Sequence, residues 1–104
     1  MEIASDKLAE DIVMLDLRPV ALFADYFVIM SAESSRQIEA LETDLTKALK
    51  DASVQRHKRE GAAASGWVLL DFSDVIVHIF SPEERGFYNL ESLWSGAPQV
   101  VRVL

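Results

Sequence analysis

The sequence predicts an α/β domain in which helices flank a mixed β-sheet. Two short runs rich in β-branched and aromatic residues, 26–30 and 75–80, are typical of strands. Between them, apolar residues recur at steps of three and four, as on one face of an amphipathic helix. Because strands and helices alternate along the chain, the simplest packing is a sheet with helices against it.

Length and composition indicate one globular domain over residues 1–104. A chain of 104 residues has the size of a single domain, and half of its residues are hydrophobic. It has no cysteine, which excludes disulfides, thiol catalysis and iron–sulfur clusters, and we expect no cofactor. No apolar run approaches the ~18–20 residues of a membrane span, and residues 1–6 lack the pattern of a signal peptide. We therefore expect a cytoplasmic domain without a membrane partner.

The charge of the chain indicates what kind of partner it would bind. Ten basic and seventeen acidic side chains give a net charge of −7, the opposite of the basic surface of a nucleic-acid-binding protein. Sequence-specific binding to nucleic acid is therefore not expected. Long-range attraction favours a basic protein as partner, while solubility alone remains an equally good reason for the charge.

The first part of the chain is predicted to hold a short helix followed by two strands. Residues 5–10 begin with Ser5, a hydroxyl suited to a helix N-cap. Residues 11–17 are too short and too apolar to favour another helix, and they form a strand that ends before Pro19. Residues 26–30 form the second strand.

The longest predicted helix begins after Ser34. Residues 34–37 have the form of a capping box, and the stripe behind them consists of Ile38, Leu41, Leu45, Ala48 and Leu49. Residues 54–60 are polar and compatible with an edge strand, and residues 61–66 are expected to be a flexible turn. His57, among basic neighbours, is interpreted as part of a solvated strand or loop.

The last part of the chain predicts a hairpin and a final helix. Strands 67–72 and 75–80 are separated by a turn at Ser73-Asp74. Ser81 and Pro82 form a favourable helix start. The helix would continue to residue 94 and bury one face, on which we place Phe87, Leu90, Leu93 and Trp94. Residues 96–98 would end the helix, and the sequence leaves the state of residues 99–104 open.

The sequence offers few residues for catalysis or metal binding. His57 and His78 have no second histidine at a metal-binding spacing, so no metal site is expected. His78 lies inside a strand, where a hydrogen-bonded structural role and a partner contact both remain open. The glycines of 61–66 have the spacing of a phosphate loop, but Trp67 and Val68 stand where Lys and Ser or Thr would contact phosphate and magnesium.

Asp71 and Asp74 are the carboxylate pair that would best support an enzymatic alternative. Two carboxylates at a strand end can hold magnesium for nucleotidyl transfer. Aspartate is also common in turns, because its side chain accepts local backbone hydrogen bonds. Turn formation or a partner contact therefore competes with metal binding at these positions.

Aromatic residues crowd the region from the hairpin to the last helix. Most of them must fill the core of so small a domain, but Trp and Tyr at the surface are typical anchors of protein interfaces. Trp67 begins its strand beside the turn, and Tyr88 neighbours the apolar stripe of its helix. These two residues are our candidate anchors.

Several separated blocks closely resemble the ribosomal silencing factor (RsfS, or Iojap) family. The similarity runs in register from residue 5 to residue 94, and residues 95–104 lie outside it. Ser73 replaces the glycine usual in that turn, which argues against a positive φ there, and Ala32 replaces the glycine usual after the second strand. The blocks are Ala24-Asp25-Tyr26-Phe27-Val28-Ile29, Ser34-Ser35-Arg36-Gln37, Glu60-Gly61, 67–80 and 85–94.

The resemblance implies a fold like that of nucleotidyltransferases without their catalytic constellation. It also implies a factor that binds the large ribosomal subunit through ribosomal protein L-fourteen, blocks joining of the small subunit and represses translation when nutrients are short. A magnesium-dependent, nucleotidyltransferase-like enzyme is the rival hypothesis, and self-association as a homodimer is the third. For the first hypothesis we expect a partner-binding region formed by Trp67, Asp71, Asp74, His78, Phe80 and Tyr88.

Overall fold

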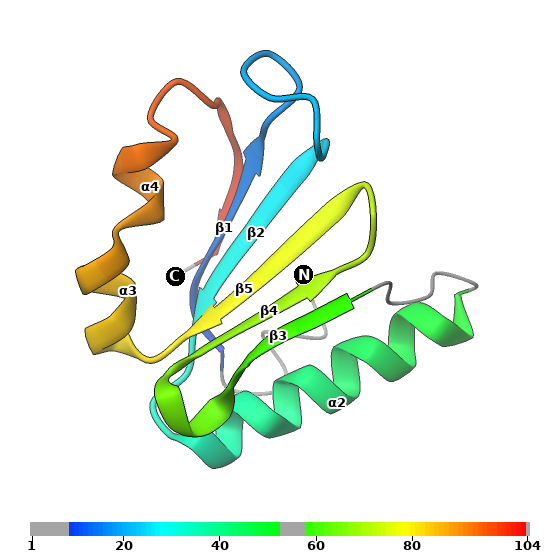
Figure 1. Ribbon diagram of the computed structural model, residues 1–104, viewed down its shortest axis with the longest axis vertical. Coiled ribbons are helices and arrows are strands. Elements are labelled where there is room, and N and C mark those ends of the chain that lie inside the picture. The colour runs from blue at the N-terminus through cyan, green and yellow to red at the C-terminus, as the bar shows by residue number, and fades with distance from the viewer. Residues whose placement is uncertain (1–8, 53–57, 104) are drawn as a thin grey trace.

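The fold is a mixed β-sheet with helices on both faces, as the sequence predicts. The computed structural model describes residues 9–52 and 58–103 (Figure 1). Six strands pair in the order β3-β4-β5-β2-β1-β6; β2 and β5 run parallel, and every other neighbouring pair is antiparallel. In chain order the elements are β1 (Glu10–Asp16), β2 (Tyr26–Ser31), α2 (Ser35–Asp51), β3 (Lys58–Ala62), the 3₁₀ turn η1 (Ala63–Ser65), β4 (Trp67–Asp71), β5 (Val75–Phe80), α3 (Pro82–Tyr88), α4 (Leu90–Leu93) and β6 (Gln99–Val103).

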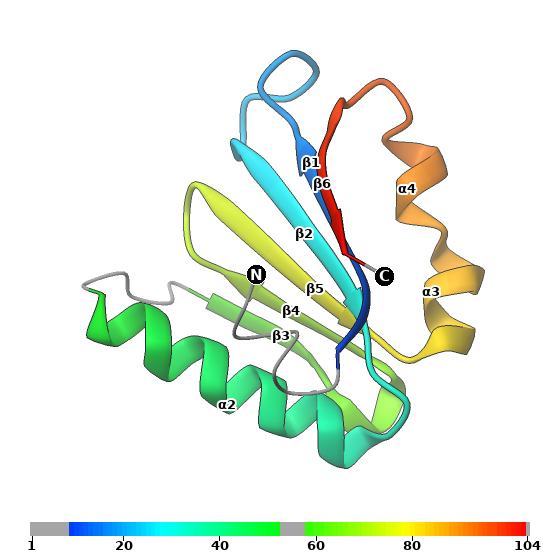
Figure 2. The same ribbon diagram turned by 180° about the vertical axis from the view of Figure 1, so that it is seen from behind.

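The sheet separates two apolar layers. Helix α2 covers one face, and α3 with α4 lies against the other, as the two opposite views show (Figures 1 and 2). The layer under α2 includes Ile38, Leu41 and Val68. The second layer includes Phe27, Ile29 and Phe80, with Leu90 and Trp94 packed against it. None of the helices in the described part of the chain is long and apolar enough to cross a membrane.

The predicted strands of the N-terminal half are confirmed. Strand β1 pairs with β2 through a register in which Val13 faces Ile29 and Leu15 faces Phe27. Of the helix predicted over residues 5–10, residues 5–8 lie outside the described residues, and Glu10 already belongs to β1. The prediction of helical structure at Glu10 is therefore wrong, because pairing with β2 extends the strand to that residue.

The capping box and apolar stripe of α2 are also confirmed. Ser34 Oγ accepts the Gln37 N–H at 3.2 Å, and Gln37 Oε1 accepts the Ser34 N–H at 3.2 Å. The buried side chains of the helix are Ile38, Leu41 and Leu45. Arg59 on β3 donates to the Glu42 carboxylate, at 2.9 Å for one of its nitrogens, which ties the edge strand to the helix.

Residues 61–66 have regular structure where the sequence predicts a turn. Gly61 and Ala62 complete β3, and Ala63–Ser65 form a 3₁₀ turn that ends at Gly66 with a φ of 85°. Gly61 has a φ of 86°, and a Cβ atom there would lie 2.2 Å from the carbonyl oxygen of Trp67. The predicted edge strand is confirmed from residue 58 onward, whereas residues 54–57, with His57, lie outside the described residues.

The turn between β4 and β5 has a positive φ despite the absence of glycine. Ser73 adopts a φ of 77°, so the expectation from its replacement of glycine is wrong. Asp71 Oδ1 accepts the Ser73 N–H at 2.7 Å, and this hydrogen bond offsets part of the conformational cost.

The single helix predicted up to residue 94 is divided in two. Asn89 has a φ of 47°, which ends α3 and begins the short α4. Because the helix is interrupted there, Phe87 and Leu93 do not share the buried face; the two residues are 77% and 72% exposed. Residues 99–103, whose state the sequence left open, pair with β1 as the edge strand β6.

Replacement of Gly61 and of Gly86 by alanine should change stability in opposite directions. Gly61→Ala forces a side chain into a positive φ and against the Trp67 carbonyl, so the free energy of unfolding should fall by at least about 1–2 kcal/mol. A Cβ at Gly86, on α3, meets no heavy atom within 4 Å, so Gly86→Ala should raise it by about 0.5–1 kcal/mol. Denaturant unfolding measures both changes; equal stability of the two variants would contradict the described register of β3.

Candidate partner-binding surface

Four of the six predicted site residues form one aromatic cluster, which we define as Trp67, His78, Phe80 and Tyr88. In the β4–β5 ladder Trp67 faces Phe80, and Leu69 faces His78. The Trp67 and Phe80 ring centroids are 5.3 Å apart, and those of Trp67 and Tyr88 are 4.6 Å apart. Strand alternation thus brings three side chains to one sheet face, and α3 adds Tyr88 from above.

The members of the aromatic cluster differ in exposure. Tyr88 is 42% exposed and Trp67 is half-buried, so both offer ring surface to a partner. His78 and Phe80 are 3% and 1% exposed, because neighbouring strands and the cluster itself cover them. These two residues support the surface from beneath, and the area available for a contact comes from Trp67 and Tyr88.

A hydrogen bond between the Trp67 indole and His78 fixes the cluster internally. Trp67 Nε1 donates to His78 Nδ1 at 3.2 Å. An indole nitrogen can only donate, so Nδ1 carries no proton and the neutral imidazole holds its proton on Nε2. Burial lowers the pKa of His78 to about 4, which keeps the ring neutral near pH 7. His78 is therefore a hydrogen-bonded structural histidine.

Asp71 and Asp74 lie away from Trp67 and Tyr88, the exposed part of the aromatic cluster. Trp67 begins β4 and Asp71 ends it. Four residues of a strand span about 13 Å, so both carboxylates lie at the opposite end of the hairpin from Tyr88. Asp74 is exposed, and its backbone oxygen accepts the N–H groups of Asp25 and Tyr26 at 2.8 and 3.1 Å. The predicted region thus extends along the whole hairpin, with the exposed aromatic rings at one end and the two carboxylates at the other.

The carboxylate of Asp71 serves the turn. Its Oδ1 accepts the Ser73 N–H at 2.7 Å, as aspartate commonly does in turns. Within the ranges 9–52 and 58–103, no three His, Asp or Glu side chains come together in a metal-binding arrangement. Asp71 therefore has a structural role in the turn, which is one of the roles that the sequence left open for it.

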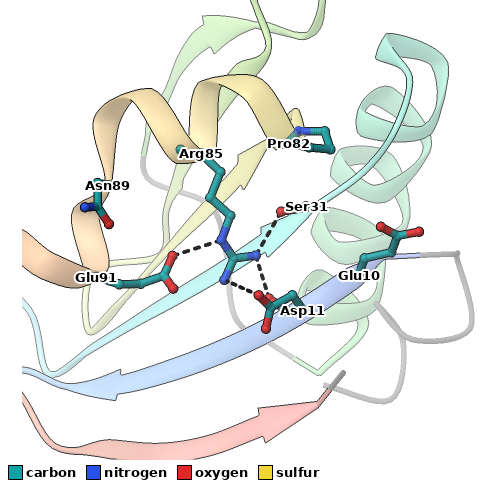
Figure 3. A pocket seen from close by; sticks show the side chains of 8 residues that line it. Glu10, Asp11, Ser31, Pro82, Arg85, Asn89 and Glu91 are labelled. Carbon is teal, nitrogen blue, oxygen red and sulfur yellow. Dashed lines mark hydrogen bonds and ion pairs between the residues drawn. The ribbon is translucent and has the colours of Figure 1, made fainter.

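A buried arginine holds α3 and α4 on the sheet. Arg85, 9% exposed, donates to the Asp11 backbone oxygen at 2.6 Å, to Ser31 Oγ at 2.9 Å and to Glu91 Oε1 at 2.9 Å (Figure 3). Arg102 on β6 donates to both carboxylate oxygens of Asp11 at 2.9 and 3.0 Å. This network joins β1, β2, α3, α4 and β6, and so sets the position from which Tyr88 reaches Trp67.

Sequence reasoning missed Arg85. A charged residue on a short helix is ordinarily solvated, and nothing near it in the sequence indicates burial. Its partner Asp11 lies 74 residues away and adopts a φ of 47° at a break in the β1–β2 register. The burial of Arg85 follows from contacts with segments that are distant in the sequence.

Comparison with known proteins shows strong similarity to one family. The sequence pattern of the family described as "Ribosomal silencing factor during starvation" (RsfS) matches residues 1–103, and therefore continues into the C-terminal segment that the motifs left outside. Ribosomal silencing factor RsfS of Bacillus subtilis is 43% identical over 93 residues, covering 89% of this chain and 79% of that protein. Mitochondrial assembly of ribosomal large subunit protein 1 of Mus musculus is 36% identical over 90 residues, covering 84% of this chain and 40% of that protein.

Solved structures show the same fold. A crystal structure of a protein from Chromobacterium violaceum superposes with a TM-score of 0.86 at 31% identity, covering 99% of this chain and 85% of that one. A second, from Bacillus halodurans, gives a TM-score of 0.82 at 36% identity, covering 96% and 90% of the two chains.

Titration of His78 should make stability depend on pH. Because its pKa is about 4 in the folded protein and near 6.5 in the unfolded chain, the unfolded chain binds the proton first as the pH falls. The free energy of unfolding should therefore decrease by up to about 3 kcal/mol from pH 6.5 to pH 4 through this group alone.

His78→Asn, which keeps a hydrogen-bond acceptor for Trp67 but does not titrate, is the control. Denaturant unfolding of both proteins across this pH range isolates the contribution of His78 as the difference between the two curves. Parallel curves would show that the imidazole is not buried in its neutral form.

Proposed function

Because the chain belongs to the ribosomal silencing factor family, we propose that it is a ribosome-associated repressor of translation that binds the large ribosomal subunit. In this proposal it binds through ribosomal protein L-fourteen in the cytoplasm and prevents the small subunit from joining, above all when nutrients are limiting. It acts as a binding protein and not as an enzyme. The name of the mouse relative, which refers to assembly of the ribosomal large subunit, supports the choice of subunit.

The observation that carries the proposed contact is the exposed part of the aromatic cluster. Trp67 and Tyr88 present adjoining rings on a rigid sheet face, and such rings are frequent anchors in protein interfaces. Their positions are held by the ladder, by His78 and by the Arg85 network, so little order has to be gained on binding. An aromatic pair that is already held in place is well suited to anchor a contact with a partner protein.

Charge supports a protein as partner rather than ribosomal RNA. The net charge of −7 repels phosphate and attracts a basic protein surface. Asp74, exposed at the far end of the hairpin, would lie at the rim of a contact centred on the aromatic cluster. Charges in that position act mainly on the rate of association and on its dependence on salt.

Exclusion of the small subunit requires only affinity and bulk. The domain measures 23 Å along its shortest axis. Two surfaces held that far apart cannot form contacts, which need heavy atoms within about 4–4.5 Å. An interface of about 600–800 Å² on each partner, with one or two aromatic anchors, would suffice to hold the domain in place.

Sedimentation with separated ribosomal subunits tests this proposal. The protein should sediment with the large subunit and not with the small one, and its addition should reduce the formation of subunit couples. Binding to neither subunit at low salt would refute the proposal. Saturable binding of magnesium and a nucleoside triphosphate that Asp71→Ala abolishes, measured by calorimetry, would support the enzymatic alternative instead.

Removal of the Tyr88 ring should weaken binding without unfolding the domain. Tyr88→Ala deletes half of the exposed aromatic pair, so affinity for the large subunit should fall by about tenfold or more. Tyr88→Phe keeps the ring and should retain most of the affinity. Co-sedimentation gives the affinities, and circular-dichroism melting should remain nearly unchanged because the side chain is 42% exposed. Equal affinity of the wild type and Tyr88→Ala would show that this face is not the interface.

Charge reversal at Asp74 should slow association and reduce its sensitivity to salt. Asp74→Lys places a cation at the expected rim, so the association rate should fall several-fold at low ionic strength. Asp51→Lys makes the same change at the end of α2, on the opposite face of the sheet, and serves as control. Stopped-flow binding at two salt concentrations measures the effect; identical rates for the two variants would remove Asp74 from the interface.

A further inference from the structure

A hollow lies beside the aromatic cluster at the β3 edge of the sheet. It has a volume of about 180 Å³ and is lined by Glu60, Gly61, Trp67 and Leu69. The strand register explains it: Trp67 lies between Phe80 on β5 and Ala62 on β3. Phe80 stacks on the indole, whereas Ala62 offers only a methyl group, so the side of Trp67 toward β3 has no large neighbour on that strand.

The lining of the hollow combines apolar walls with one carboxylate. Trp67 and Leu69 lie on the same side of β4, and Glu60 stands directly across from Leu69. The Trp67 N–H is already donated to His78, so the indole offers its ring surface rather than a hydrogen bond. Ring surface beside a carboxylate is a favourable environment for a cation with an apolar stem.

The size of the hollow fits a side chain rather than a metabolite. Its volume is about 180 Å³. Pockets for small-molecule ligands generally measure about 300–1,000 Å³. One long side chain contributed by a docked protein would fill this space.

We propose that the hollow is a socket for one arginine side chain of the basic partner protein, with its guanidinium group stacked on Trp67 and paired with Glu60. This inference rests on the proposed function and adds a binding residue, Glu60, to the surface. Arginine fits better than lysine because its planar group stacks on aromatic rings and pairs with both oxygens of a carboxylate.

Lys58 is the group that an incoming arginine would displace. Its Nζ lies 3.1 Å from Glu60 Oε1, but the two side chains are 60% and 56% exposed. Such an exposed pair contributes little to stability. Lys58 faces Asp71 in the strand register, so a second carboxylate is close by when Glu60 pairs with the partner. When the partner's arginine takes the place of Lys58 at Glu60, Lys58 therefore still has the Asp71 carboxylate nearby, and neither cation lacks a neighbouring opposite charge.

Two substitutions test the charge and the space of the socket separately. Glu60→Gln removes the carboxylate and keeps its shape, and Ala62→Leu places a larger side chain opposite Trp67, beside the hollow, from an exposed position on the edge strand. Glu39→Gln makes the same charge change on an exposed position of α2, on the other face of the sheet, and is the control. Affinity for large ribosomal subunits is measured by co-sedimentation, with circular-dichroism melting to confirm folding.

Both Glu60→Gln and Ala62→Leu should weaken binding by about tenfold, and Glu39→Gln by less than about twofold. Loss of affinity in Ala62→Leu alone would indicate an uncharged occupant, and loss in Glu60→Gln alone would indicate a charge contact outside the hollow. Either result, or wild-type affinity in both variants, would overturn the socket. Failure of the wild-type protein itself to bind large subunits would instead refute the proposed function.

Discussion

The hydrogen bond from the Trp67 indole to His78 is the interaction on which the candidate surface depends. It uses the one polar atom of the indole inside the domain, so the part of Trp67 that faces solvent is apolar ring. Burial keeps His78 neutral, which leaves Nδ1 free to accept that hydrogen bond. Loss of either partner would leave a polar atom buried without a hydrogen bond, at a cost of about 1–3 kcal/mol. The anchor is thus held rigid by the same contact that stabilises the sheet face beneath it.

The Arg85 network holds Tyr88, the second exposed residue of the surface, in position. Tyr88 is one turn beyond Arg85 on α3, and it reaches Trp67 only because Arg85 is tied to Asp11, Ser31 and Glu91. Burying a guanidinium group costs several kcal/mol unless its polar atoms find partners. Here Nε and Nη1 donate to oxygens of three other elements, and Nη2 lies 3.6 Å from the Asp11 carboxylate. Helices as short as α3 and α4 have little stability of their own. Their position is therefore set by this network and by the apolar contacts of Leu90 and Trp94.

Local sequence patterns were sufficient for most of the fold and insufficient for the site. The strands of the hairpin and the capped helix α2 could be predicted because their signals lie within a few residues of each other. The break at Asn89 could not, because Phe87, Leu90, Leu93 and Trp94 fit one helical face equally well until the packing of α4 is known. Strand β6 forms by pairing with β1, and the buried position of Arg85 depends on its hydrogen bond to Asp11. Both features therefore rest on contacts between residues that are distant in sequence. The sequence indicates Trp67 and Tyr88 as candidate anchors but not their contact with each other, and the separation of Asp71 and Asp74 from them follows from the length of β4.

The proposed function depends on contact between the aromatic cluster and a basic protein of the large subunit. Photo-crosslinking measures this contact most directly, with a benzophenone amino acid in place of Phe87, which is 77% exposed and stacks edge-on against Tyr88 at 5.0 Å. With purified large subunits, the predicted product is a covalent adduct with ribosomal protein L-fourteen. The adduct should form when the label is placed in the otherwise wild-type protein, and its yield should fall when Tyr88→Ala is added. Adducts confined to ribosomal RNA, or to proteins of the small subunit when both subunits are present, would contradict the account.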